Sequence, residues 1–273
     1  MIYIGIIFFL ILGLIIGSFL NVVILRLNTG RGISGRSGCL SCNKKLHWHE
    51  LLPVVSFFVL KRKCSGCGSK ISWQYPLVEI FTGLIFLAIF LKQLSVFYIA
   101  PILAIIGLVF FLVIWSILIV IFVYDLRHTI IPNGLAYTFA ILSFIYLLIS
   151  IPRDLWFKFP FVLDITSGFI FFIPFFLLWF LSKGRWIGLG DGKLVLGIGF
   201  LLGFISGLSA IIISFWIGAI FAIFFMLMSR LNTARHNITM KSEIPFAPFL
   251  IIGTLILFFV PIDILGVTFL LEI

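Results

Sequence analysis

Long apolar runs, separated by short polar or basic segments, dominate the pattern of this chain. A membrane-spanning helix needs about 20 mainly apolar residues, and most of these runs approach or exceed that length. They also lack the polar face of a soluble protein's surface helix. We therefore expect an all-α polytopic membrane protein with about eight transmembrane helices, near residues 2–25, 76–91, 98–124, 134–151, 161–182, 194–205, 207–229 and 246–270.

The boundary between the sixth and seventh predicted helices needs a separate argument. The charge-free run 194–229 has 36 residues, too many for one ordinary span, and basic residues flank it at Lys193 and Arg230. Because basic flanks favour the cytoplasmic side, both ends of this run are predicted to face the same side. A hairpin that turns near 203–207 satisfies this condition.

Composition and charge placement support a membrane protein and give it an orientation. The chain is 63% hydrophobic and 10% charged, whereas soluble domains average about 25% charged residues. Nine of its 19 basic residues lie between the first two runs, which indicates a cytoplasmic loop touching anionic lipid rather than a nucleic-acid partner. If both termini lie outside the cytoplasm, 16 basic residues face the cytoplasm and three do not: Lys92, Arg153 and Lys158.

Residues 2–25 lack the basic start and the cleavage pattern of a signal peptide, so we expect them to form a retained helix.

Two aspartates lie where a long apolar run meets a short basic loop. Asp125 belongs to the YDLR segment 124–127, and Asp191 to the GLGDGK segment 188–193. The predicted orientation places both on the cytoplasmic side. Carboxylates at a membrane boundary are costly, so they are kept for chemistry or for ion movement. The remaining carboxylates fall on the other side and are expected to be ordinary solvated groups: Asp154, Asp164, Asp263 and Glu272.

Such a pair can hydrolyse a peptide bond. Two neighbouring carboxyl groups share a proton, so one acts as a base on water while the other polarises the scissile carbonyl. Gly188 and Gly190 would let an extended substrate approach the backbone closely. Lys193 would favour the ionised form of Asp191, or would bind lipid phosphate. The alternative is that Asp191 only caps a helix that begins near 192 or 193.

The four cysteines form two CxxC pairs, Cys39/Cys42 and Cys64/Cys67, separated by 21 residues. This spacing is near that of zinc ribbons, and four thiolates leave no open position, so we predict a structural zinc site. Disulfides are disfavoured in a reducing cytoplasm. His47 and His49 are weaker candidates as ligands.

These motifs resemble those of the prepilin peptidases, which are type IV leader peptidases and GxGD membrane aspartyl proteases. The resemblance implies Asp125 and Asp191 as the catalytic pair. It further implies cleavage of basic leaders from type IV prepilins or pseudopilins at the bacterial inner membrane, followed by N-methylation from S-adenosylmethionine. It covers most of the chain and rests on segments 17–23, 36–79, 124–133, 188–194 and 244–249.

The resemblance also suggests a division of the chain and leaves alternatives open. We expect a first transmembrane helix at 1–25, a cytoplasmic four-cysteine domain at 26–75 with a possible methyltransferase role, and a peptidase core at 76–273. Glu79 has two interpretations: it orients the four-cysteine domain or a substrate, or its side chain extends to the membrane–water interface. Asn21 is expected to form a hydrogen bond with a neighbouring helix. The competing functions are an ion-coupled transporter that uses the aspartates as a proton relay, a presenilin-like protease and a zinc-dependent scaffold.

Overall fold

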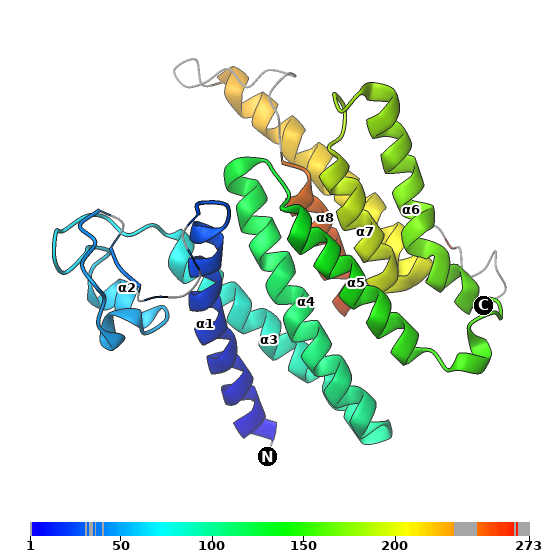
Figure 1. Ribbon diagram of the computed structural model, residues 1–273, viewed down its shortest axis with the longest axis horizontal. Helices are drawn as coiled ribbons and strands as arrows, with labels where there is room; N and C mark the ends of the chain where they lie inside the picture. The colour runs from blue at the N-terminus through cyan, green and yellow to red at the C-terminus, as the bar shows by residue number, and fades with distance from the viewer. Residues whose placement is uncertain are drawn as a thin grey trace. The chain divides into compact units, whose positions relative to one another are not determined.

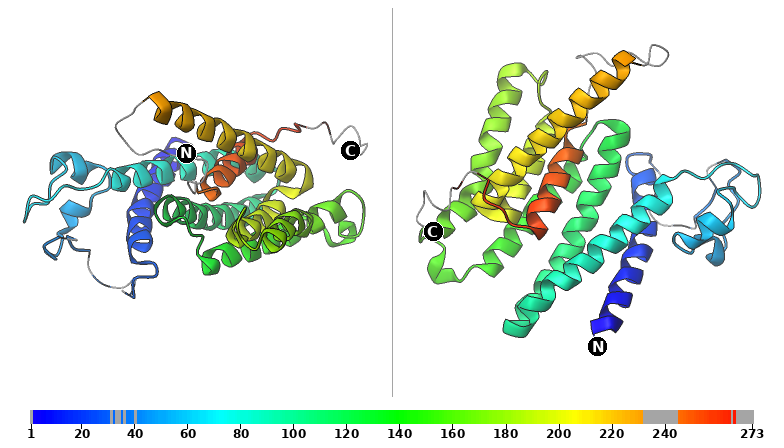
Figure 2. Two further views of the ribbon diagram at one scale, coloured as in Figure 1. Left: turned by 90° about the horizontal axis from the view of Figure 1, so that it is seen from above. Right: turned by 180° about the vertical axis from the view of Figure 1, so that it is seen from behind.

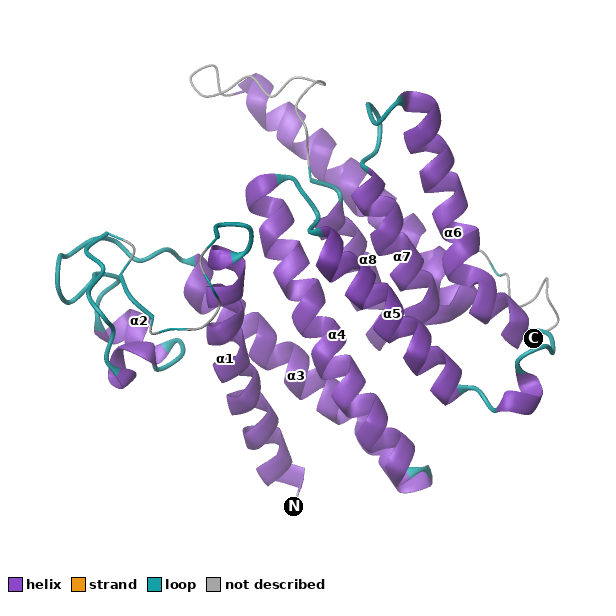
Figure 3. Ribbon diagram, viewed as in Figure 1, coloured by secondary structure: helices purple, strands orange, loops and turns teal. Residues whose placement is uncertain are grey.

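A computed structural model describes residues 2–30, 32, 35, 37–39, 41–231, 245–264 and 266. Within these ranges the chain forms helices joined by loops, and no strand is present (Figure 3). Two isolated β-bridges, Gly38 with Lys45 and Lys63 with Lys70, lie among the cysteines. The predicted all-α fold is confirmed. Six residues used in the predictions lie outside the described residues: Arg31, Arg36, Arg235, Lys241, Ile244 and Glu272. In chain order the elements are α1 (Ile2–Arg26), η1 (Trp48–Leu51), α2 (Val55–Val59), α3 (Gln74–Ile99), α4 (Pro101–His128), α5 (Asn133–Ser150), η2 (Arg153–Leu155), α6 (Phe161–Ser182), α7 (Leu189–Leu231) and α8 (Ala247–Phe259).

Six of the described helices are long and apolar enough to cross a membrane, namely α1, α3, α4, α5, α6 and α7. The predicted limits 2–25 and 161–182 fall within one residue of those of α1 and α6. The predicted helix 246–270 is wrong at its end, because α8 stops at Phe259. Pro261 follows closely, and the residue before a proline is disfavoured in the helical conformation.

Helix α7 contains the predicted reversal. Gly203 lies inside it with φ 75° and ψ −172°, outside the helical region, and Figure 1 shows the chain turning back at this level. Oδ1 of Asp164, in α6, accepts the N–H of Phe204 at 2.8 Å and so caps the second half of α7. The expectation that Asp164 is an ordinary solvated carboxylate is therefore wrong. Inside a bilayer the N–H groups freed by a helix break need such a partner.

The chain divides into two compact units, Met1–Val120 and Ile121–Ile273. In the first unit α1 packs tightly against α3. A Cβ on Gly13 would lie 2.7 Å from Cα of Gly83, and one on Gly17 would lie 2.7 Å from Cα of Glu79. Small residues spaced by four allow this close approach of two membrane helices. As expected, Asn21 joins the pair, because its amide nitrogen donates to the Tyr75 carbonyl at 3.2 Å.

In the second unit α7 packs against α5, α6 and α8. Gly197 leaves room for the ring of Phe139 in α5, and Gly199 lies against Gly168 in α6. Helix α8 lies beside the C-terminal half of α7, as Figures 1 and 2 agree. This packing fixes the start of α7, which carries Asp191, and the start of α8.

Candidate active site

The two predicted catalytic aspartates lie close together within the second unit. Asp125 is in the last turn of α4 and Asp191 in the first turn of α7. The Asp125 residue is 4% exposed, and Asp191 is partly buried. The two carboxyl groups are near enough to interact electrostatically. Residues distant in sequence therefore form one acidic site, at the ends of two membrane-spanning helices.

Asp125 is held by the start of α8. The backbone N–H of Ala247, the first residue of that helix, donates to the Asp125 carboxylate. The first N–H groups of a helix have no partner within it and carry partial positive charge, so they favour an anion. Among the described residues, the other oxygen, Oδ2, is buried without a hydrogen-bond partner. A buried acceptor in this condition is unfavourable until a donor reaches it.

Asp191 is held by its own helix start. Its carboxylate lies beside Gly188, the residue just before α7, and a Cβ on Gly188 would be 3.5 Å from Oδ2. An acidic residue at this position of the first turn can reach back to the residue preceding the helix, as in a capping box. Because α7 begins at Leu189, Asp191 lies inside the helix. The alternative that it caps a helix starting near 192 or 193 is wrong in position.

The other predicted site residues fasten α7 to the start of α5. A Cβ on Gly190 would lie only 3.0 Å from Cβ of Ile131, so the glycine permits this contact. Nζ of Lys193 donates to Oδ1 of Asn133 at 2.8 Å and lies 4.8 Å from the centre of the Tyr137 ring. Both contacts flank Asp191 along the helix. They fix the position and rotation of its first turn.

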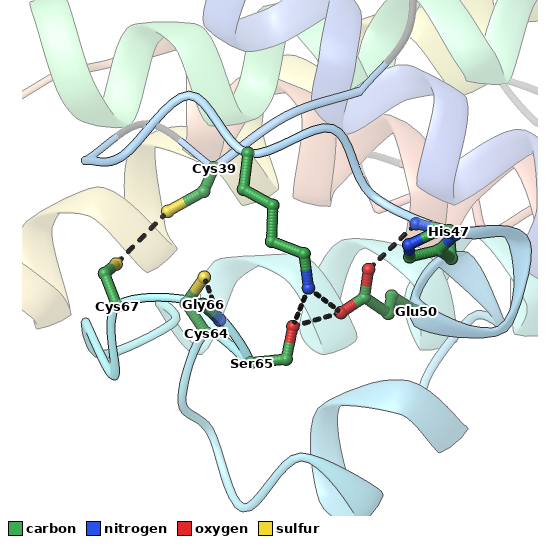
Figure 4. Close-up of polar contacts among 8 residues, drawn as sticks. Cys39, His47, Glu50, Cys64, Ser65, Gly66 and Cys67 are labelled. Atoms are coloured by element: carbon green, nitrogen blue, oxygen red, sulfur yellow. Dashed lines mark hydrogen bonds and ion pairs between the residues drawn. The ribbon is translucent and has the colours of Figure 1, made fainter.

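The four cysteines lie in the first unit and form a group that can hold a metal ion. Their sulfur atoms all lie within 4.8 Å of one another, and those of Cys39 and Cys67 are 3.8 Å apart (Figure 4). The group comprises Cys39, Cys42, Cys64 and Cys67, all without disulfides. The rings of His47 and His49 stack on each other, with centres 5.5 Å apart, and neither belongs to the group.

The two CxxC pairs fold alike. The N–H of Cys39 donates to the carbonyl of Lys44, and the N–H of Cys64 donates to that of Ser69. In each pair the residue after the second cysteine has a positive φ, 54° at Asn43 and 72° at Gly68. These turns aim both sulfur atoms of a pair toward one point. Two equivalent turns then face a common centre, as a four-thiolate site requires.

A polar network joins the two turns beside the cysteines. Lys44 Nζ donates to Oγ of Ser65 at 2.6 Å and to Oε1 of buried Glu50 at 3.3 Å (Figure 4). The Ser65 hydroxyl donates to Glu50, and so does the His47 N–H, at 2.8 Å. The hydroxyl of Ser65, followed by that N–H, lowers the pKa of Glu50 to about 2. The network crosslinks the segments that carry the two cysteine pairs.

Comparison with known proteins identifies the family. Two family models match the chain. The model described as "Bacterial Peptidase A24 N-terminal domain" matches residues 11–93, and the model described as "Type IV leader peptidase family" matches residues 111–223. Relatives named prepilin leader peptidase/N-methyltransferase include one from Bacillus subtilis (strain 168), 32% identical over 90% of this chain and 90% of the relative. Another, from Vibrio cholerae serotype O1, is 30% identical over 94% of this chain and 97% of the relative. The chain belongs to the type IV leader peptidase family.

A third relative, from Myxococcus xanthus (strain DK1622), is 31% identical over 89% of this chain and 69% of its own length. No solved structure matches the chain. The family's two matched regions divide the candidate residues, since the first contains the four cysteines and the second contains both aspartates. Family membership and the six long apolar helices identify a multi-pass membrane protein.

Two parts of the site were absent from the sequence interpretation. The Ala247 N–H that binds Asp125 is a main-chain donor, and its only sequence signal is the helix start between Pro245 and Pro248. The Glu50 network uses residue types that are common in loops, so no local motif pointed to it. The sequence also left the role of Glu79 open. In the structure Oε2 of Glu79 accepts the N–H of Val54, so Glu79 binds the segment just before α2.

Proposed function

We propose that this chain is a prepilin leader peptidase in which Asp125 and Asp191 carry out the hydrolysis. The observation that carries the proposal is the electrostatic interaction between these two carboxyl groups, from the ends of α4 and α7, in the part of the chain that matches the type IV leader peptidase family. Its substrates are type IV prepilins or pseudopilins, cut at the cytoplasmic face of the bacterial inner membrane.

The pair acts on a water molecule placed between the carboxyl groups and the scissile peptide. The ionised carboxylate takes a proton from water as the oxygen attacks the carbonyl carbon, and the protonated carboxyl donates to the carbonyl oxygen. The tetrahedral intermediate collapses when the leaving amine receives a proton. Oδ2 of Asp125, which has no hydrogen-bond partner in the described part of the chain, is available for this exchange. Because the pair titrates as a unit, neither aspartate is assigned a fixed role.

The supporting residues position Asp191. Gly188 lies beside its carboxylate, Gly190 leaves room for Ile131, and Lys193 donates a hydrogen bond to Asn133. A displacement of about 1 Å can lower a catalytic rate about a hundredfold. These contacts therefore matter for the rate although none of them performs the chemistry. Proton relay by a transporter has no support from the family or from the position of the aspartates at helix ends.

The four cysteines are proposed to bind structural zinc. A tetrahedron with Zn–S bonds of about 2.3 Å has sulfur atoms about 3.8 Å apart, and Cys39 and Cys67 have this separation. Four thiolates leave no position for substrate, so the ion would stabilise the fold of residues 26–75, a segment too small to bury a large core. The basic residues of this segment support its location in the cytoplasm.

The relatives' names support a second activity, N-methylation of the new amino terminus. S-adenosylmethionine would supply the methyl group. We propose that residues 26–75 contribute to this step and that residues 76–273 contain the peptidase core. We assign no residues to the methyl donor.

The test is incubation of the purified full-length protein with a prepilin, with and without S-adenosylmethionine, followed by mass spectrometry of the product. We expect loss of the leader and, with the donor, a further 14 Da at the new amino terminus, the mass of one methyl group exchanged for hydrogen. Asp125→Asn and Asp191→Asn are each expected to reduce cleavage at least a thousandfold. Cleavage that persists in both variants would contradict the assignment of the pair.

A further inference from the structure

The segment between α1 and α3 has an exposed apolar face. In α2, Val55, Phe58 and Val59 are spaced at i, i+3 and i+4, so they lie on one side, whereas Phe57 is buried. Phe58 is 58% exposed and Val59 73%. Helix η1 packs beside α2 and adds further exposed side chains. We call this set the α2 face: Trp48, Leu51, Leu52, Val55, Phe58 and Val59.

The charge around the α2 face has one sign. Lys61, Arg62 and Lys63 follow α2 directly and are exposed. The Arg62 guanidinium lies over the Trp73 ring, 4.8 Å from its centre, which leaves the two lysines as the projecting charges. Between residues 26 and 75 the only acidic residue is Glu50. Since Glu50 is buried and paired with Lys44, it does not offset the charge of this surface.

The segment just before α2 is bonded near the start of α3, a helix that is long and apolar enough to cross a membrane. The N–H of Val54, immediately before α2, donates to Oε2 of Glu79 at 2.7 Å. Glu79 is the sixth residue of α3, so at 1.5 Å per residue it lies roughly 7.5 Å beyond the start of that helix. Figure 1 likewise draws α2 beside α1 rather than beyond its end. The residue that precedes α2 is thus tied to the second turn of α3.

We propose that the α2 face docks on an anionic lipid bilayer. Val55, Phe58 and Val59 enter the region between headgroups and acyl chains, and Lys61 and Lys63 contact lipid phosphates. An apolar face with flanking lysines is the usual composition of an interfacial anchor, and each lysine near an anionic surface adds about 1 kcal/mol of attraction. Both features fit lipid better than a soluble partner, because the residue before α2 is bonded near the start of α3, a helix long and apolar enough to cross a membrane.

Photocrosslinking in lipid nanodiscs tests the proposal with the full-length protein. p-Benzoyl-L-phenylalanine replaces Phe58 or Val59, and in a matched control it replaces Ser41, an exposed residue of the first cysteine turn. In nanodiscs with about one third phosphatidylglycerol, irradiation is expected to give at least tenfold more phospholipid adduct from 58 and 59 than from 41. Equal adduct from all three positions, or none from 58 and 59, would overturn the proposal. The proposal would also fail if, in native membranes, positions 58 and 59 crosslinked only to protein and not to lipid.

A second measurement separates docking from folding. Lys61→Gln with Lys63→Gln is expected to reduce the adduct from position 58 at least threefold in anionic nanodiscs and to leave it unchanged in neutral ones. Phe58→Ser with Val59→Ser is expected to raise hydrogen exchange of residues 48–63 in nanodiscs but not in detergent. Retained zinc content reports that the variants fold. If exchange rises equally in both environments, the α2 face serves folding alone and the proposal fails.

Discussion

Nζ of Lys193 donates a 2.8 Å hydrogen bond to Oδ1 of Asn133 and thereby joins the first turn of α7 to the first residue of α5. Asp191 lies in the same turn as Lys193. The bond crosses 60 residues of sequence, and the Tyr137 ring beneath the ammonium group adds a cation–π contact. The orientation of a proposed catalytic carboxylate thus depends on a pair that does not touch the carboxylate itself.

Substitution of either member of this pair should slow cleavage. Lys193→Met and Asn133→Ala are each expected to lower kcat about tenfold, since a hydrogen bond to a charged group contributes about 1.5 kcal/mol. KM should change less than twofold, because neither side chain is assigned to substrate binding. The double variant should be no slower than the slower single variant, since both remove the same bond. Lys193→Arg, which keeps a donor, is the control, and additive losses would contradict the positioning role.

The two glycines before Asp191 should differ in their tolerance of alanine. A Cβ on Gly190 would lie 3.0 Å from Cβ of Ile131, so Gly190→Ala must displace the first turn of α7 by a few tenths of an ångström. We expect about a tenfold loss of kcat. A Cβ on Gly188 would lie 3.5 Å from Oδ2 of Asp191, an ordinary contact, so Gly188→Ala should retain activity within about twofold. The reverse ranking would show that contact with Ile131 does not limit the position of Asp191.

Removal of the metal should affect the two units differently. Cys39→Ser and Cys64→Ser are each expected to reduce bound zinc from one ion to near zero and to raise hydrogen exchange across residues 37–72. Leader cleavage should fall less than about threefold, since both aspartates and their partners lie in the other compact unit. Methylation should be lost together with zinc. Ser41→Ala, between the ligands of the first turn, is the matched control and should retain the ion.

The Glu50 network should stabilise its domain in a pH-dependent way. The pKa of Glu50 is lowered from 4.5 to about 2, first by the Ser65 hydroxyl and then by the His47 N–H. Because the folded-state value lies below the unfolded one, the contribution is fully present above pH 4.5 and decreases as pH falls toward 2. The stability difference between the wild type and Glu50→Gln, measured by hydrogen exchange of residues 44–65, should therefore shrink between pH 5 and 3. A difference that stays constant over this range would exclude the ionised carboxylate as its source.

Hydropathy predicted most helices because a bilayer requires long apolar segments whose backbone groups are satisfied internally. The start of α7 was placed five residues too late, at 194 instead of Leu189. Glycines at 188, 190 and 192 indicate a loop by propensity. Tertiary packing overrides that preference, since Gly190 fits Ile131 and Gly192 fits the rings of Phe172 and Phe175.

For the site, charge placement was enough to select the two aspartates as partners, because it placed the ends of their helices on one side of the membrane. It could not reveal what surrounds them. The donor to Asp125 is the main chain of Ala247, and main-chain groups have no residue-specific signature. The partner of Lys193 lies 60 residues away, and only the packing of α5 against α7 determines that distance.

The reversal at Gly203 also bears on how the chain enters the bilayer during synthesis. The insertion machinery receives residues 194–229 of α7 as one charge-free stretch of 36 residues, with no hydrophilic segment to mark where the first crossing ends. The N–H of Phe204 finds its acceptor on Asp164, in the helix synthesised just before. We therefore expect α6 to act as a template that must already be in the membrane when the turn forms. On this account the two halves of α7 leave the translocation channel as a pair.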